Sequence, residues 1–389
     1  MHSLNAFGGN TSVALHADPT PRRDVGSVAL VHDYLTQRGG AERVVASMRA
    51  AFPGAPLYTS LFEPEGTFPV FGESEIKTLA VNKVGLFRRH HRLAFPVLAP
   101  TFSHLTVDAE VTLCSSSGWA HAAHTTGRKV VYCHTPARWL YQTATYLGEH
   151  GSGSKKWAIR AFGSGLRMWD RHVAQTADRY LVNSNAVRTR VKETYGIEAE
   201  VLPPCVTIGR DDPQTPLEGV APGFWLCVSR FLPYKNIDAI VDAFAEMPGE
   251  QLVLVGSGPQ REHILSHAPS NVFVAGQVDD SCLAWLYANC QALVAASFED
   301  FGLTPLEANV FGKPVAVLGW GGHLDTLQDG ITGYFFDSPT PAAIRRAVHR
   351  VASTDWSEEA IMAHARNFDQ NQFVRRLREV IEEERLLAA

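Results

Sequence analysis

The chain has 389 residues, of which 45% are hydrophobic and 19% charged, and its formal net charge is −5. This length is typical of about two globular domains, each able to bury its own core, and the composition excludes collagen-like and disordered classes. No apolar run approaches the ~18 to 20 residues of a membrane-spanning helix, and the first residues do not resemble a secretory signal, so we expect a cytoplasmic protein.

Charge is divided unevenly along the chain. Residues 1–200 contain 22 Lys and Arg against 16 Asp and Glu, whereas residues 201–389 contain 13 against 24. This asymmetry indicates two domains with different partners, but no basic stripe interleaved with aromatic residues favours nucleic acid. The six cysteines form no C-x-x-C pair and lie mostly in apolar runs, which predicts buried free thiols rather than disulfides or a zinc site.

The first half of the chain has the pattern of a parallel sheet. Residues 1–24 are polar and aperiodic, and we expect a flexible tail there. VGSVALVHDY then predicts a buried strand, and GGAERVVASMRAAF predicts a helix. Further short apolar runs alternate with helical stretches, at residues 111–116, 129–133, 179–184 and 199–203. Such alternation indicates βαβ units, and we assign residues 25–207 to an N-terminal domain.

The same pattern restarts after a loop rich in Pro and Gly, residues 203–223. A strand at 224–229 precedes a helix predicted over Lys235–Phe244, and four more strands are expected at 251–256, 271–276, 291–297 and 314–319. Residues 208–369 therefore form a second domain, and a final helix is expected over 370–389. The fold class is α/β, with two Rossmann-like doubly wound domains facing across a cleft. Ligands of such sheets bind beyond the carboxyl ends of the strands.

One segment at a strand end has the features of a diphosphate site. SFEDFGLTPLE (297–307) follows a predicted strand and opens a helix, so its backbone N–H groups and the helix dipole favour an anion. Glu299 and Glu307 flank these groups, and a carboxylate can accept hydrogen bonds from vicinal hydroxyls of a sugar or ribose. Alternatively, Glu307 only complements the helix terminus and Glu299 is a solvated loop residue. The backbone groups belong to Phe301, Gly302, Leu303 and Thr304.

Two cations follow the first strand of the same domain. Arg230 and Lys235 lie five residues apart in SRFLPYKN, at a strand–helix junction directed at the same cleft. The planar guanidinium of Arg can donate two parallel hydrogen bonds to phosphate oxygens, and the ammonium of Lys acts as a point charge beside them. The alternative is an ordinary surface pair, but a helix-terminus anion site in the same domain favours the functional interpretation.

These motifs resemble those of the retaining glycosyltransferases of family 4. SRFLPYKN, LVLVGSGP, VFVAGQVDD and EDFGLTPLEANVFGKPVAV are similar to its donor domain, and RGGAERV, YCHTPARWLY and ADRYLVNSNAVRTRVKETYG to its first domain. The motifs YCHTPARWLY and EDFGLTPLEA are particularly similar to those of the branch that contains bacterial O-antigen mannosyltransferases. The resemblance runs from about Val28 to about Asp337 and implies the two-Rossmann-domain glycosyltransferase B fold. It also implies that residues 25–207 bind the acceptor, that residues 208–369 bind the nucleotide-sugar donor, and that the helix over 370–389 packs back on the first domain.

The resemblance also implies roles for the residues above. Glu299 would hold hydroxyls of the donor sugar and Glu307 the nucleotide ribose, while Arg230 and Lys235 would neutralise the departing diphosphate. Residues that would line the donor further are Gly39 and Gly40, where backbone approaches phosphate, and Gly276, Gln277 and Val278 against the base.

His134 follows the predicted strand KVVYC and matches the family histidine near the reacting centre. We therefore count it, with Glu299, Lys235 and Arg230, among the catalytic candidates. A lone histidine is often structural, and this alternative stays open. GGHLDT departs from the family pattern near the donor pocket, which leaves the sugar unassigned.

Two motif absences in the sequence bear on cofactors. There is no D-x-D pair of the kind that holds a metal on the diphosphate, and Arg230, Lys235 and the helix terminus can neutralise it, so neither metal nor cofactor is expected. GSGP (256–259) lacks the third glycine of a dinucleotide fingerprint, which argues against a dehydrogenase.

The segment 82–102 mixes basic and apolar residues without any acid, and residues 155–171 form a second cluster of basic and apolar residues. Such segments can contact anionic lipid or a phosphorylated acceptor, although a solvated helix is the alternative. We expect peripheral contact with the inner face of the cytoplasmic membrane.

The sequence thus predicts a retaining, metal-independent transferase. It would move a hexose, mannose from GDP-mannose, onto a hydroxyl of a glycan or lipid-linked acceptor. The alternatives are a UDP-sugar donor, a sugar-nucleotide epimerase of the same fold, and a non-catalytic sugar or lipid binder.

Overall fold

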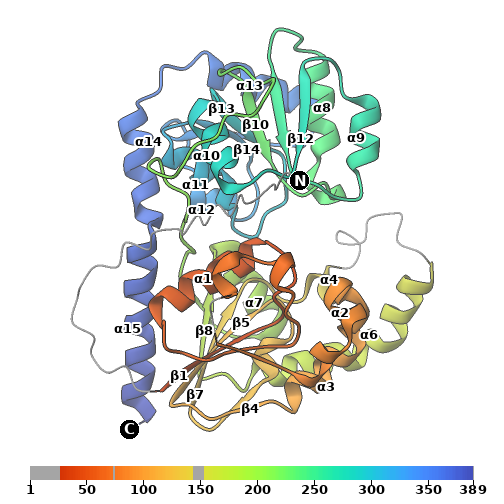
Figure 1. Ribbon diagram of the computed structural model, residues 1–389, viewed down its shortest axis with the longest axis vertical. Helices are drawn as coiled ribbons and strands as arrows, with labels where there is room; N and C mark the ends of the chain where they lie inside the picture. The colour runs from red at the N-terminus through yellow and green to blue at the C-terminus, as the bar shows by residue number, and fades with distance from the viewer. Residues whose placement is uncertain (1–26, 73–74, 143–152, 389) are drawn as a thin grey trace, which may run out of the picture.

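The structure, a computed structural model, describes residues 27–72, 75–142 and 153–388. It consists of two α/β halves, one above the other in Figure 1, and the helix α15 (Gln370–Ala388) runs down the side of the N-terminal half. The expected tail, residues 1–24, lies outside the described residues.

A parallel sheet forms the centre of the N-terminal half. Its strands are short runs of apolar residues buried on both faces, which is typical of parallel sheets covered by helices. The order of its seven described strands is β3 (Ile76–Thr78), β2 (Leu57–Thr59), β1 (Val28–His32), β5 (Val111–Ser116), β7 (Arg128–Cys133), β8 (Arg179–Val182) and β9 (Glu200–Val201). A small parallel pair lies apart, β4 (Thr106–Val107) with β6 (His124–Thr125).

Helices connect these strands, and local chemistry defines their ends. The hydroxyl of Ser184 caps the first turn of α7 by accepting from the Val187 N–H at 3.1 Å, and Gly196 ends that helix at φ 71°. The helices are α1 (Gly40–Ala51), α2 (Gly85–Arg89), α3 (Phe95–Ser103), α4 (Arg138–Tyr141), α6 (Gly153–Ala174) and α7 (Asn185–Tyr195). Short 3-10 turns add Pro64–Gly66, Pro69–Phe71, Ala80–Lys83, His91–Ala94 and Ala120–Ala122.

The C-terminal half is a second sheet of parallel strands. Its six described strands are ordered β12 (Val272–Gly276), β11 (Leu252–Val255), β10 (Trp225–Val228), β13 (Ala292–Ala295), β14 (Val315–Leu318) and β15 (Gly333–Phe336). The helices around it are α8 (Ile237–Ala245), α9 (Arg261–His267), α10 (Asp280–Asn289), α11 (Leu303–Val310), α12 (His323–Thr326), α13 (Pro341–Ala352) and α14 (Glu358–Ala365), with 3-10 turns at Pro233–Lys235 and Arg366–Phe368. The predicted fold class, two doubly wound parallel domains, is confirmed.

The chain returns to the N-terminal half through α15. Phe373, Leu377, Val380 and Ile381 are buried against residues of α1 and of the first sheet. Ion pairs extend this contact, because Arg128 of β7 lies 2.7 Å from Glu384. Packing of α15 thus adds a layer to the first domain.

The structure corrects one predicted helix. We expected a helix over Lys235–Phe244, but Asn236 has a left-handed backbone (φ 52°) that separates the turn Pro233–Lys235 from α8. Lys235 therefore lies in a turn before the helix. Strands β2, β3 and β15 lie outside the runs predicted as strands, because three or four residues are too few to show a pattern.

All six cysteines are buried free thiols, as predicted. No helix in the described ranges is long and apolar enough to cross a membrane.

Candidate functional site

The carboxyl ends of the two sheets face each other. Asp300, just beyond β13, contacts Arg138 beyond β7 at 2.6 Å and receives a hydrogen bond from Ser184 beyond β8 at 2.5 Å. An ideal Cβ built on Gly40, at the start of α1, would lie 4.0 Å from Leu303, at the start of α11. The loop before α1 and the loop from Glu299 to α11, both predicted to bind the donor, are therefore brought together between the domains.

Glu299 and Lys235 form the central ion pair of this region. The Lys235 ammonium donates to Glu299 Oε1, and the Ser297 hydroxyl donates to the same oxygen at 3.0 Å. Burial opposes ionisation of Glu299, but Lys235 and the nearby His323 outweigh it and lower its pKa to about 2. Glu299 is thus a fixed anion, able to accept from hydroxyl groups.

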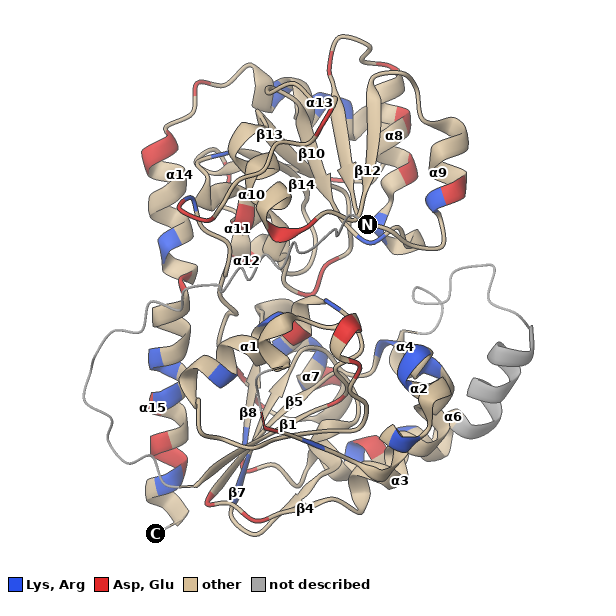
Figure 2. Ribbon diagram, viewed as in Figure 1, with Lys and Arg blue, Asp and Glu red and all other residues tan. Residues whose placement is uncertain are grey.

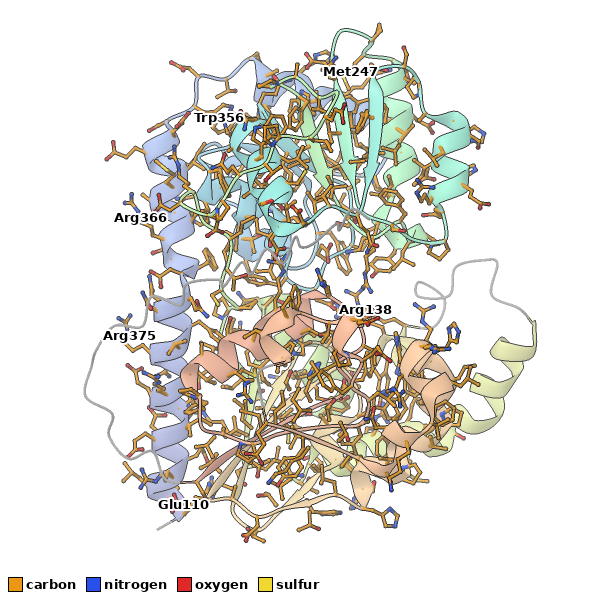
Figure 3. The ribbon with its side chains drawn as sticks, in the orientation of Figure 1. Glu110, Arg138, Met247, Trp356, Arg366 and Arg375 are labelled. Carbon is orange, nitrogen blue, oxygen red and sulfur yellow. The ribbon has the colours of Figure 1, made fainter. Side chains whose placement is uncertain are left out.

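Cations from both domains surround the ring of Tyr234. Lys235 Nζ lies 5.0 Å from the ring centroid and the Arg138 guanidinium 5.3 Å, while Arg230 Nη2 donates to the Tyr234 hydroxyl at 3.4 Å. Figure 3 shows Arg138 at the edge of the N-terminal half that faces the other half. Arg138 and Tyr234 are missing from the sequence-based candidates, although both lie inside the quoted motifs HTPAR and FLPYK. This arrangement can stabilise negative charge developing between the domains.

The structure places Glu307 inside α11, only 4% exposed. The Tyr287 hydroxyl donates to its Oε2 at 2.6 Å, and Arg43 Nη1 of the N-terminal domain lies 3.7 Å from its Oε1. Tyr287, twenty residues earlier in the chain, had no signal in the sequence that could identify it. The carboxylate is therefore held in place from both domains.

The backbone at the start of α11 adopts a left-handed conformation at Gly302, which favours glycine. Gly302 has φ 91°, and a Cβ there would lie 2.5 Å from the His323 ring, so only glycine fits. Phe301 and Gly302 are buried, whereas Leu303 and Thr304 are partly exposed. Gly302 thus determines the backbone conformation at the start of α11, where the phosphate contact is predicted.

Gly39 and Gly40 lie at the start of α1, beside a buried carboxyl group. A Cβ on Gly39 would lie 2.5 Å from Glu42 Oε2, and Gln37 Nε2 donates to the other carboxyl oxygen at 3.1 Å. Burial raises the pKa of Glu42 to about 7. Glu42 was not among the predicted residues, and it lies where the resemblance places phosphate.

His134 follows β7 and is 8% exposed. The Ser115 Oγ lies 2.8 Å from His134 Nε2 and 3.0 Å from His32 Nδ1, so one hydroxyl joins two imidazoles. Burial, with a smaller effect of His32, lowers the pKa of His134 to about 3, and burial lowers that of His32 to about 4. Both rings are neutral at neutral pH, which leaves His134 able to act there as a neutral hydrogen-bonding group but not as a proton donor from the charged form.

Gly276 ends β12, and Gln277 and Val278 follow it. Two strands, β11 and β10, separate β12 from β13, so these residues lie at a different part of the same sheet edge from Glu299. Gly276 has φ 76°, a turn conformation that favours glycine.

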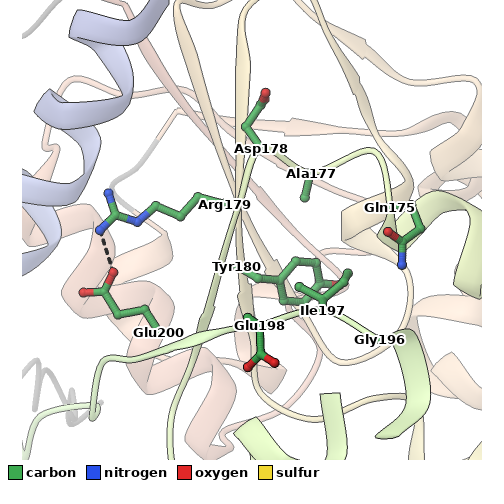
Figure 4. Close-up of a pocket in the computed structure, with 9 residues that line it drawn as sticks. All are labelled: Gln175, Ala177, Asp178, Arg179, Tyr180, Gly196, Ile197, Glu198 and Glu200. Atoms are coloured by element: carbon green, nitrogen blue, oxygen red, sulfur yellow. Dashed lines mark hydrogen bonds and ion pairs between the residues drawn. The ribbon is translucent and has the colours of Figure 1, made fainter. Parts of the chain in front are cut away.

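A pocket of about 410 Å³ lies away from these loops, among Arg179, Tyr180, Gly196 and Glu200 (Figure 4). Arg179 and Glu200 are the first residues of β8 and β9, so the pocket lies at the amino ends of the strands. It contains none of the predicted site residues, and ligands of such sheets bind at the opposite ends.

Two family models match consecutive parts of this chain. Residues 38–210 match the family model "Glycosyltransferase Family 4", and residues 211–372 match "Glycosyl transferases group 1". The chain belongs to glycosyltransferase family 4. It is a glycosyltransferase, as the sequence predicted.

The relatives of this chain include proteins named as mannosyltransferases. The alpha-1,3/1,6-mannosyltransferase ALG2 of Dictyostelium discoideum is 23% identical, with 84% of this chain and 89% of the relative covered. The D-inositol 3-phosphate glycosyltransferase of Actinosynnema mirum is 28% identical, with 51% of this chain and 56% of the relative covered.

Solved structures show the same fold. HepE of Anabaena, in complex with UDP and glucose, matches with a TM-score of 0.67 and 17% identity, covering 92% of this chain and 99% of HepE. The lipopolysaccharide outer core galactosyltransferase WaaB matches with a TM-score of 0.61 and 17% identity, covering 92% and 99%. The glycosyltransferase B fold implied by the motifs is confirmed.

Proposed function

We propose that this glycosyltransferase moves mannose from GDP-mannose to a hydroxyl of a glycan or lipid-linked acceptor, with retention of configuration and without a metal ion. The observation that carries the proposal is the grouping of Arg138, Arg230 and Lys235 around Tyr234, beside the fixed anion Glu299. The name of the Dictyostelium relative supports mannose as the sugar.

The reaction needs only positioning and charge stabilisation from the protein. The bond between the anomeric carbon and the diphosphate oxygen breaks while the acceptor hydroxyl oxygen bonds to the same face of the sugar. The hydroxyl proton passes to the departing phosphate oxygen. Arg230 and Lys235 would stabilise the charge on the diphosphate, and Glu299 would orient the sugar hydroxyls.

His134 would contribute as a neutral group beside the reacting centre, because its imidazole is uncharged at neutral pH. Glu307, held by Tyr287, would accept from the ribose. Gly39, Gly40 and the start of α11 would contact phosphate, and Gly276, Gln277 and Val278 the base.

A panel of nucleotide sugars tests the donor. We expect GDP-mannose to raise the melting temperature most and to release GDP when acceptor glycans are added. A UDP-sugar is the rival donor, because the similar HepE structures contain UDP or UDP-glucose. Greater stabilisation by UDP-sugars would contradict our choice, and turnover of the sugar without an acceptor would indicate the epimerase instead.

The segment 82–102 supports a lipid-linked acceptor. Its apolar side chains Val84, Leu86, Leu93 and Val97 are exposed, at 38% to 56%. Among its basic residues, Lys83, Arg89 and Arg92 are exposed, and Figure 2 shows basic residues on α2. Arg88 instead folds back to Glu63 at 3.4 Å.

We propose that this surface, which we call the α2–α3 surface, rests on anionic lipid at the cytoplasmic face of a membrane. Of the second basic segment, 155–171, the side chains up to residue 162 lie outside the described residues.

A further inference from the structure

One carboxylate of the donor loop is held by the opposite domain. Asp300 lies between Glu299 and Phe301, and its two oxygens contact Arg138 at 2.6 Å and Arg190 at 2.5 Å. The three side chains are only 13% to 17% exposed. We infer that Asp300 is a positioning residue, which holds the loop of Glu299 in register with the loop of His134 when the domains are together.

Arg190 contacts both the donor loop and the loop of His134. Arg190 Nη1 donates to Asp300 Oδ1 and also, at 2.7 Å, to the hydroxyl of Thr135, the residue after His134. A single guanidinium therefore joins the donor loop to the His134 loop. A displacement of either loop breaks one of these bonds.

The carboxyl end of β8 holds the same two loops through neighbouring residues. The Asn183 amide donates to the carbonyl of His134 at 3.0 Å, and the Ser184 hydroxyl donates to the carbonyl of Asp300 at 2.5 Å. Because Asn183 and Ser184 are consecutive, their spacing sets the distance between the loops. The donor loop is thus fixed to the first domain through both its side chain and its backbone.

Physical chemistry explains why this bridge sets a position rather than merely adding a contact. A carboxylate between two guanidinium groups has strong, directional, charge-assisted hydrogen bonds. If one partner of a largely buried ion pair moves away, the charge that remains is buried without an opposite charge beside it. This is unfavourable, so the arrangement resists small shifts of either loop. Misplacement of reacting groups by about 1 Å can cost about a hundredfold in rate. Asp300 itself carries no direct role on the sugar in this scheme.

A second interdomain contact offers a matched control. Asp325 of α12 accepts from the backbone N–H of Asn185 at 2.6 Å and from its side chain at 2.8 Å, in an exposed position. These bonds cross the same interface and reach neither the Glu299 loop nor the His134 loop. Asn185→Ala therefore removes an interdomain side-chain hydrogen bond and leaves the link between the Glu299 loop and the His134 loop intact.

The test compares Asp300→Asn with Asn185→Ala in the full chain and rests on the proposed function for its kinetic part. We expect Asp300→Asn to lower kcat about ten- to a hundredfold, with the calorimetric affinity for free GDP changed less than about twofold. Small-angle scattering of the protein alone should show a larger radius of gyration for Asp300→Asn only. Asn185→Ala should keep kcat within about twofold of the wild type.

Arg190→Gln provides a second route to the same link if Asp300→Asn does not fold. The effects of Arg190→Gln and Asp300→Asn on kcat should be non-additive, because both break one bridge. Additive effects, or an unchanged kcat in Asp300→Asn, would overturn the inference. A wild type that turns over no nucleotide sugar would refute the proposed function alone. In that case equal radii of gyration for wild type and Asp300→Asn would overturn the bridge independently.

Discussion

Side chains in the cleft owe their charge states to burial and to one or two neighbours. Glu299 is ionised because Lys235 lies against it, whereas Glu42, buried with one carboxyl oxygen unpartnered, has a pKa raised to about 7. His134 is neutral because it is buried beside another histidine. Three ionisable groups near the same interface therefore respond to pH in three different ways.

Glu307 should act in binding more than in chemistry. Its proposed contact with ribose is far from the reacting carbon, so it persists from ground state to transition state, and Glu307→Gln should raise the donor KM more than it lowers kcat. A lost charge-assisted hydrogen bond costs about 1.5–3 kcal/mol, or roughly ten- to a hundredfold in KM. Tyr287→Phe, which removes the hydroxyl bonded to Glu307, should have the same direction and a smaller size. Steady-state kinetics would contradict this role if kcat fell more than KM rose.

The histidine pair should make the protein sensitive to acid. The pKa of His134 is about 3 in the folded protein against 6.5 for the ordinary side chain, so between these values the unfolded chain binds more protons. Stability is therefore lost as pH falls below about 6.5. His134→Gln should gain relative to the wild type by up to roughly 3 kcal/mol between pH 6.5 and 4.5. Urea unfolding at several pH values measures this gain.

Exposed His104 supplies the control for that experiment. His104→Gln should show no comparable change in relative stability across the same pH range. If His134→Gln follows the pH dependence of the wild type, the imidazole is charged in the folded protein and the burial argument is wrong.

At the scale of elements, α15 contributes to the first domain although it is the last helix of the chain. Its buried residues recur on one face, and the opposite face is polar. Periodicity alone predicted this helix and its apolar residues. It did not identify α1, β5 and β7 as the elements that α15 contacts, because several apolar surfaces of either domain could accept such a face.

Truncation of one α15 residue should destabilise the N-terminal half. Leu377 is fully buried in the cluster around α1, and Leu377→Ala should cost about 2–5 kcal/mol through lost burial and the cavity left behind. Arg375, two residues away and pointing outward in Figure 3, is the control, and Arg375→Ala should stay within about 0.5 kcal/mol. Chemical unfolding curves compare the two variants. A loss below about 1 kcal/mol for Leu377→Ala would mean that α15 is only loosely attached.

At the scale of the whole molecule, the α2–α3 surface should direct the protein to anionic membranes. We expect sedimentation with vesicles of phosphatidylglycerol and phosphatidylcholine at low salt, and release as salt screens the charges. The variant Lys83→Gln/Arg89→Gln/Leu86→Ser should lose most of this binding. Arg366→Gln/Arg375→Gln removes two exposed charges on the far side of the molecule and should bind as the wild type does (Figure 3). Equal recovery with pure phosphatidylcholine vesicles would contradict the proposal.

The sequence by itself determined the features that depend on neighbours in the chain. Apolar runs identified the central parallel strands, and the periodicity of α1 and α15 identified those helices, because burial on both faces or on one face leaves a local pattern. The cations after β10 and the carboxylates around the start of α11 were likewise visible, since strand ends and helix termini are places where backbone geometry creates anion sites.

Only the tertiary structure decided which distant groups meet. Lys235 bonds to Glu299, 64 residues away within the C-terminal domain. Arg190 bonds to Asp300, 110 residues away, across the domain interface. His134 is buried inside the first domain beside Ser115 and His32, and this burial makes its ring neutral, although its place after a strand indicated only proximity to the cleft. Hydrogen-bond partners and pKa shifts depend on three-dimensional packing and on desolvation, and neither leaves a periodic trace along the chain.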